Sequence, residues 1–235
     1  SADTSLFRSV TMRAVYLAQD RQDIAEATKN LSREMKEPSE ASMRDLKRLG
    51  RYLKHRPRLV AVFQAQRMPE TIQSYGDSDH AGCLKTRRST TGVGVMLGSH
   101  LLKTYSQVQS TISLSSGESE YYAMLKASAT GLALRAMLED WRIQLKLQVL
   151  SDSSAARGLV ARRGLGKARH IQTRYLWLQE RVAEKDLQVI SVPTSVNIAD
   201  LFTKSLTEQR ILELLALMNL EFREGRADTA KRLIK

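Results

Sequence analysis

The spacing of apolar and small residues between positions 111 and 141 predicts the longest helix of the chain. These residues recur at steps of three and four, the repeat of one helix face, at Met124, Ala127, Gly131, Leu134, Leu138 and Trp141. One further step of four before Met124 places Glu120 on the same face. Because an unpaired carboxylate on a buried face is costly, we expect a compensating group close to Glu120.

The same repeat predicts helices over residues 5–18, 23–35 and 41–54 in the first part of the chain. An apolar run over 58–64 predicts a strand, and 65–70 is typical of a domain boundary. The third helix has one basic side, formed by Arg44, Lys47, Arg48, Arg51 and Lys54. This side fits an ordinary solvated surface or a contact with a nucleic-acid backbone.

Beyond residue 70, strand patterns alternate with helical ones, which predicts an α/β fold. The strands are expected at 71–77, 91–97, 101–105, 147–151 and 187–192. Shorter helices are expected at 152–160, 170–184, 198–205 and 208–219. The charged segment 221–235 has too few apolar residues to pack firmly.

The net charge of the chain bears on the kind of partner that it binds. The chain has 37 Lys and Arg against 25 Asp and Glu, a net charge of +12, which indicates a polyanionic partner or serves solubility alone. A single cysteine, Cys83, excludes an internal disulfide and a cysteine-rich zinc site. No apolar run approaches the ~20 residues of a membrane span, and no signal-peptide pattern is visible. We therefore expect no membrane partner and an intracellular location, in the cytoplasm or nucleus.

Acidic residues occupy the ends of predicted strands and the starts of predicted helices, where open α/β sheets place their sites. They are Asp77, Glu120, Asp152 and Asp200. Four clustered carboxylates repel one another unless cations bind, and oxygen ligands suit Mg²⁺ or Mn²⁺. Two such ions can activate water and stabilise the leaving oxygen of a phosphodiester. The acids therefore predict a metal-dependent site.

Each aspartate also has a purely structural interpretation. Asp77 fits a turn residue, Asp152 an N-cap, and Asp200 a first-turn acid favoured by the helix dipole. Asp79, two residues after Asp77, is an alternative first acid. Glu120 is the hardest to explain structurally, because a buried helix face is a poor place for an idle charge.

Two basic loops and one basic helix face flank these acids in the sequence. We expect phosphate contacts from Lys85, Arg87, Arg88, Arg162, Arg163, Lys167, Arg169, His170 and Arg174. The helix face also contains Trp177 and Arg181, and a solvated face is the alternative interpretation.

Several segments resemble, in order, the ribonuclease H domain of copia-type (Ty1/copia) retrotransposon Pol polyproteins. They read GDSDHAGCLKTRRSTTGVGVMLG, SLSSGESEYYAM, VLSDSSAARGL, ARHIQTRYLWLQERV and VPTSVNIADLFTKSL. Two earlier segments, QDIAEATKNLSREM and RDLKRLGRYLKHRP, resemble the end of the same family's reverse transcriptase. The chain departs from the family pattern at Gln22, His80 and Ser153. It also has no histidine over 192–199, where cellular ribonucleases H place a mobile one.

The resemblance implies a ribonuclease H-like α/β fold: a five-stranded mixed sheet flanked by helices, preceded by a small helical region. The expected divisions are 1–65 as the end of the reverse transcriptase, 71–206 as the ribonuclease H domain, and 207–235 as a C-terminal helix and charged tail.

The resemblance further implies that two Mg²⁺ ions, for which Mn²⁺ can substitute, are held by Asp77, Glu120, Asp152 and Asp200. The implied reaction is cleavage of the RNA strand of an RNA/DNA hybrid. The expected partners are this hybrid and the remainder of the Pol polyprotein. The alternatives are a non-cutting module that binds hybrid or RNA, and a structural part of a reverse transcriptase assembly.

Overall fold

Residues 2–164 and 176–225 are described by the structure, a computed structural model. The chain divides into two compact units. The first combines residues 1–62 with 220–235, and the second spans residues 63–219. The domain boundaries expected from the resemblance stay predictions.

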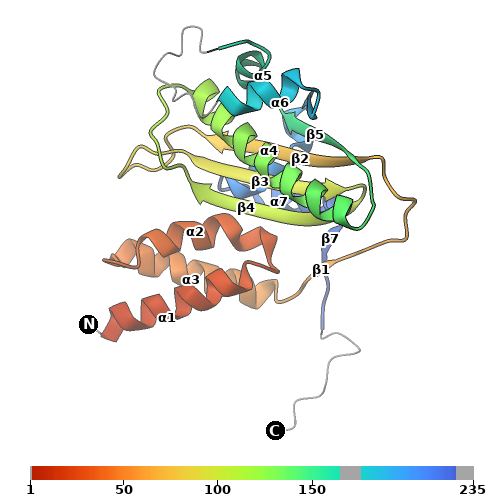
Figure 1. Cartoon of the computed structure of the whole chain (residues 1–235). Helices are drawn as coiled ribbons and strands as arrows, with labels where there is room; N and C mark the ends of the chain where they lie inside the picture. The colour runs from red at the N-terminus through yellow and green to blue at the C-terminus, as the bar shows by residue number, and fades with distance from the viewer. Residues whose placement is uncertain (1, 165–175, 226–235) are drawn as a thin grey trace. The chain divides into compact units, whose positions relative to one another are not determined.

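The first unit is mainly helical, with α1 over Ala2–Leu17, α2 over Ala25–Arg33 and α3 over Glu40–His55 (Figure 1). A short 3₁₀ turn, η1, covers Gln22–Ile24 before α2. The helices predicted over 5–18, 23–35 and 41–54 are therefore confirmed, with shifted ends. They bury a common apolar core of Phe7, Ala14, Ile24, Leu31, Leu46 and Leu49.

A small sheet completes the first unit. Strand β1 (Leu59–Ala61) pairs antiparallel with β7 (Leu220–Phe222), so the chain returns to this unit after the second. The Phe222 ring lies 5.8 Å from the Arg21 guanidinium carbon and 5.2 Å from that of Arg56. The expectation that 221–235 does not pack was wrong for Glu221 and Phe222, because backbone pairing and cation–π contacts replace apolar burial.

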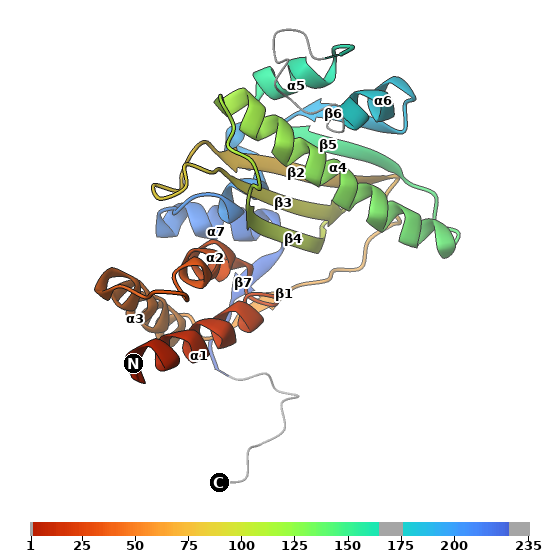
Figure 2. The ribbon, with the colours of Figure 1, turned by 60° about the vertical axis from the view of Figure 1, so that its left-hand side comes forward.

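The second unit is built on a mixed sheet with the strand order β4-β3-β2-β5-β6 (Figure 2). Strands β2 (Thr71–Asp79), β3 (Thr90–Leu97) and β4 (His100–Val108) are antiparallel neighbours. Strands β5 (Lys146–Ser151) and β6 (Leu187–Ser191) run parallel to β2. Within the described residues, the predicted α/β fold with a five-stranded mixed sheet flanked by helices is confirmed.

Helices cover both faces of this sheet. A Cβ on Gly76 would lie 3.3 Å from the Ala127 side chain of α4 (Ser116–Asp140), so Gly76 faces α4. A Cβ on Gly92 would lie 2.6 Å from the Ala199 carbonyl of η4 (Ile198–Phe202), so Gly92 faces η4. Asp77 pairs with Gly92 across the strands and points to the same face, because directly opposed residues share a face.

The remaining helices follow from the connections between strands. Helices α5 (Ser154–Val160) and α6 (Trp177–Ala183) lie between β5 and β6 in the chain, and α7 (Glu208–Leu217) packs against η4. A short 3₁₀ turn, η3, covers Thr194–Val196. Of the helix predicted over 170–184, residues 176–184 fall within the described residues, and α6 lies in this part. Among the described residues, no helix combines the length and the apolar character that a membrane span requires.

Helix α4 packs on the sheet through the first part of its predicted apolar face. Met124 and Ala127 are fully buried, and a Cβ on Gly131 would meet the Leu147 side chain at 2.6 Å. The same prediction was wrong for Trp141, which is 68% exposed. At ~1.5 Å per residue the helix is about 37 Å long, whereas the nine residues of β2 span about 30 Å. Its last turn therefore has too little sheet beneath it to bury Trp141.

Candidate metal centre

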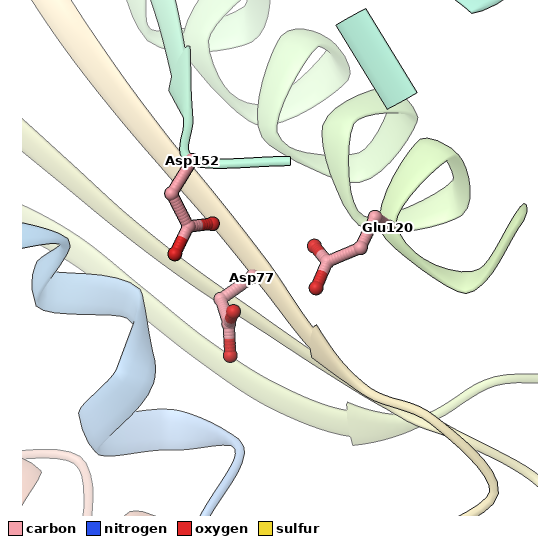
Figure 3. A group of neighbouring side chains, drawn as sticks. All are labelled: Asp77, Glu120 and Asp152. Carbon is pink, nitrogen blue, oxygen red and sulfur yellow. The ribbon is translucent and has the colours of Figure 1, made fainter. Parts of the chain in front are cut away.

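Asp77, Glu120 and Asp152 come together at one end of the sheet, and Figure 3 shows their carboxylates turned toward a common space. One carboxylate oxygen from each lies within 4.8 Å of the others. Asp77 lies on β2, Glu120 in the early part of α4, and Asp152 directly after β5. Three elements that are far apart in the sequence thus each place one carboxylate oxygen at a candidate metal site.

The sheet topology makes room for this cluster. Strand β2 pairs with β5 only as far as Tyr75 and Leu150, but it continues beside β3 to Asp79. Ser151, the last residue of β5, pairs only with Ser191 of β6. Asp77 therefore lies beyond the β2–β5 ladder, where neighbouring parallel strands part and open α/β sheets form sites.

The start of α4 is held by polar contacts that direct Glu120 to the cluster. The N-cap Ser115 accepts a hydrogen bond from the Glu118 backbone N–H at 3.2 Å. The buried Glu118 carboxylate accepts one from the Leu114 N–H at 2.9 Å and one from the Tyr122 hydroxyl at 2.7 Å. These contacts fix the first turns of the helix.

Gln109, which the sequence interpretation missed, ties the same helix to the sheet. Its buried side-chain amide donates to the Ser119 carbonyl at 2.9 Å, the Thr91 hydroxyl at 3.0 Å and the Ser78 hydroxyl at 3.3 Å. Its carbonyl oxygen accepts from the Ser113 hydroxyl at 3.0 Å. Gln109 thus joins β2, β3 and α4 one residue from Glu120. A lone glutamine after a strand gives no periodic signal from which to predict this role.

Replacing Gln109 by leucine is expected to lower the free energy of unfolding by about 1–3 kcal/mol, the cost of leaving buried partners unsatisfied. Gln107→Leu, on the exposed part of β4, is the matched control, with an expected change within ~0.5 kcal/mol. Urea unfolding followed by circular dichroism measures both. Equal losses in the two variants would contradict the anchoring role.

Asp152 is oriented by neighbours from the segment that follows β6. Its Oδ2 accepts a hydrogen bond from the Thr194 hydroxyl at 2.6 Å, and its Oδ1 lies 3.5 Å from the Asn197 Nδ2. The N-cap of α5 is Ser153, whose hydroxyl accepts from the Ala156 N–H at 3.2 Å. The alternative that Asp152 is the helix cap was therefore wrong.

Asp79 also takes a structural role. Its Oδ1 accepts a hydrogen bond from the Thr90 N–H, which closes the end of the β2–β3 ladder. In the described part of the chain it is not among the acids grouped with Glu120. Asp77 is therefore the first acid of the cluster.

The electrostatics of the cluster favour a bound cation. Burial, followed by the nearby Asp77 and Asp152 carboxylates, raises the pKa of Glu120 from 4.5 to about 9. Burial likewise raises the pKa of Asp77 from 3.8 to about 6, against the lowering effects of Lys204 and Thr203. The buried Glu120 Oε2 has no hydrogen-bond partner among the described residues. An unpaired carboxylate oxygen beside two further acids fits a hard divalent cation such as Mg²⁺ or Mn²⁺.

These pKa shifts predict that the metal-free protein loses stability as pH rises from about 4 toward about 9. A carboxyl group whose pKa is raised on folding stabilises the folded state below its unfolded pKa, and this contribution disappears as pH rises through the folded pKa. Glu120→Gln is expected to be more stable than the parent at pH 9, on the order of 1–3 kcal/mol, because it removes a buried unpaired charge.

Urea unfolding in EDTA at pH 5 and pH 9 measures this difference. The two proteins should be close in stability at pH 5 and separate at pH 9. Parallel pH dependences would contradict the assigned burial of Glu120.

Asp200 lies in η4 and is buried, but it is paired with cations rather than grouped with the other acids. Its Oδ1 lies 2.7 Å from the Lys204 Nζ, and its Oδ2 lies 3.5 Å from a guanidinium nitrogen of Arg210. Lys204 also reaches Asp77 Oδ2 at 3.3 Å, and the Thr203 hydroxyl donates to the same Asp77 oxygen. Although burial alone lowers it, the Asp77 and Asp200 carboxylates hold the pKa of Lys204 above its usual range.

The sequence interpretation also missed Lys204. Its spacing of four after Asp200, the distance at which helical residues of opposite charge pair, was a usable signal.

The basic residues expected to contact phosphates are only partly described. Lys85, Arg87 and Arg88 are exposed in the segment between β2 and β3, and Arg162 and Arg163 are exposed after α5. Lys167, Arg169, His170 and Arg174 lie outside the described residues. The phosphate contacts stay predictions.

Comparison with known proteins gives the family. The chain is 30% identical over 208 residues to the retrovirus-related Pol polyprotein from transposon RE1 of Arabidopsis thaliana, across 87% of this chain and 14% of that one. It is 28% identical over 186 residues to the Pol polyprotein from transposon TNT 1-94 of Nicotiana tabacum, across 78% and 14%. The chain belongs to the retrovirus-related Pol polyproteins of transposons. This Pol family member spans about 14% of the length of these curated relatives.

Among solved structures, this Pol family member is similar to LC11-RNase H1, crystallised in complex with an RNA/DNA hybrid. The TM-score is 0.39 and the identity 17%, across 57% of this chain and 94% of the other. No family model matches the chain.

Proposed function

We propose that this chain is a ribonuclease H that hydrolyses the RNA strand of an RNA/DNA hybrid, with divalent metal ions, during retrotransposon reverse transcription. The observation that carries the proposal is the convergence of Asp77, Glu120 and Asp152, with the Glu120 Oε2 unpaired. Kinship with Pol polyproteins supports the setting, since reverse transcription produces such hybrids.

In this proposal the catalytic residues are Asp77, Glu120, Asp152 and Asp200, and the first three can each offer an oxygen to one cation. Two Mg²⁺ ions, with Mn²⁺ as a substitute, would activate the attacking water and stabilise the leaving oxygen of the phosphodiester. The residues around the acids would orient their carboxylates. Thr194 holds one oxygen of Asp152, and Thr203 holds one oxygen of Asp77. Glu120 keeps one oxygen free for a cation.

The basic segments are the proposed binding surface for the hybrid. Lys85, Arg87 and Arg88 follow the strand that carries Asp77, and Arg162 and Arg163 follow the helix after Asp152. These exposed cations would bind the substrate backbone and position it. The remainder of the Pol polyprotein is the proposed protein partner, residues 1–65 are proposed as the end of its reverse transcriptase, and the proposed setting is intracellular.

The direct test is incubation of the full chain with a labelled RNA/DNA hybrid and Mg²⁺. We expect cleavage of the RNA strand that leaves a 3′-hydroxyl and a 5′-phosphate and that stops on addition of EDTA. Duplexes of RNA alone and of DNA alone, with the same sequence, are the substrate controls. The variant control is Asp152→Asn, which keeps the size and shape of the side chain.

The other outcomes separate the alternatives. Failure to cleave, alone and with the polymerase part of a Pol polyprotein added, would reject the enzyme. Binding of the hybrid without cleavage would favour a binding module, and no binding would favour a structural part of a larger assembly. Full cleavage by Asp152→Asn would reject the site assignment.

A further inference from the structure

Lys204 lies between the three-acid cluster and the fourth acid. Its ammonium nitrogen is 2.7 Å from Asp200 Oδ1 and 3.3 Å from Asp77 Oδ2. Its side chain is 41% exposed, whereas those of Asp77 and Asp200 are 1% and 6% exposed. The lysine therefore approaches two buried carboxylates from solvent and joins them.

The acids are unequally neutralised as a result. Asp77 has Lys204 and Thr203 as partners, and Asp200 has Lys204 and Arg210. Glu120 has no ion pair among the described residues, and its Oε2 is buried without a partner. The negative charge that remains to be compensated is thus concentrated on the side of Glu120 and Asp152.

The balance between the acidic and basic side chains of the site indicates how many divalent cations it accommodates. When ionised, Asp77, Glu120, Asp152 and Asp200 carry four negative charges, and Lys204 and Arg210 supply two positive ones. One divalent cation neutralises the remainder. A second divalent cation that used Asp200 would lie close to the ammonium of Lys204, and the repulsion between the two cations would oppose its binding.

We propose that Lys204 is a resident cation of the acidic site, which occupies the Asp77–Asp200 side and limits the free protein to one tightly bound divalent ion. A second ion then binds only when Lys204 moves away from Asp200. The exposed approach of the side chain leaves it free to swing toward solvent or toward a substrate phosphate. This inference deepens the proposed function, but it concerns cation binding without nucleic acid.

The test is a titration of the full chain with Mn²⁺ in the absence of nucleic acid, with free Mn²⁺ measured by electron paramagnetic resonance. The parent is expected to bind one ion tightly. Lys204→Met is expected to gain a second ion, or to bind the first at least about tenfold more tightly. Lys204→Arg, which keeps the charge, should bind like the parent. Lys103→Met, on the exposed part of β4, is the matched control and should also bind like the parent.

Two results would overturn the proposal: a parent that binds two Mn²⁺ ions tightly, or a Lys204→Met protein with the parent's stoichiometry and affinity. Circular dichroism checks that the variants fold, and Lys204→Gln replaces the methionine variant if that protein is unfolded. Because the titration measures cation binding and not cleavage, its result is independent of whether the chain is a ribonuclease H. If the chain binds Mn²⁺ as expected but does not cleave the hybrid, the proposed enzyme is rejected and the proposed role of Lys204 stands.

Discussion

Replacing Glu120 by glutamine is expected to lower the rate of hybrid cleavage about 10³-fold or more, close to 4 kcal/mol of transition-state stabilisation. Glutamine has the same size as glutamate, but it offers a neutral amide in place of the unpaired carboxylate oxygen. Single-turnover cleavage of a labelled hybrid in Mg²⁺ measures the effect. Because this substitution also removes a buried charge, the metal-free variant should fold at least as well as the parent.

The matched control for this prediction lies on the same helix. Glu139→Gln, near the end of α4, removes an exposed carboxylate whose Arg135 partner is 3.4 Å away. Exposed ion pairs of this kind contribute only about 0–1 kcal/mol to stability. Since Glu139 is also outside the proposed set of catalytic acids, cleavage by this variant should match the parent. Cleavage by Glu120→Gln within threefold of the parent would remove Glu120 from the proposed site.

Replacing Phe202 by alanine is expected to lower the free energy of unfolding of the second unit by about 3–5 kcal/mol. Phe202 is fully buried, and its ring lies 3.4 Å from where a Cβ on Gly94 would be. Its carbonyl accepts a hydrogen bond from the Ser106 hydroxyl of β4 at 2.6 Å. The aromatic ring therefore fixes η4, which carries Asp200, against the sheet.

Phe63 provides the comparison, since it is 64% exposed and makes an edge contact with His100 at 5.2 Å between ring centroids. Phe63→Ala should cost less than about 1 kcal/mol in urea unfolding. Equal destabilisation by the two substitutions would show that η4 is not held by this ring.

Local patterns in the sequence are sufficient to predict most helices and strands and to select Glu120 as the strongest candidate for a site residue. The step of three and four on α4 placed Met124 and Ala127 in the core and Glu120 on the same face, because helix periodicity is a local property. The same local reasoning failed at Trp141, since it contains no information on where the sheet beneath the helix ends. The order of several motifs along the chain identified the Pol family, which the comparisons confirm.

The contacts between polar groups from different elements become visible only in the folded chain. Asp77 faces η4, whereas Glu120 comes from the helix on the opposite face, and they approach each other beyond Tyr75, where the β2–β5 ladder stops. The structure likewise decided that Ser153 caps α5 and that Gln109 anchors the start of α4. These are contacts between distant segments, and their energies depend on burial and distance, which no local pattern contains. For the same reason, only the folded chain shows that Lys204 joins Asp77 to Asp200.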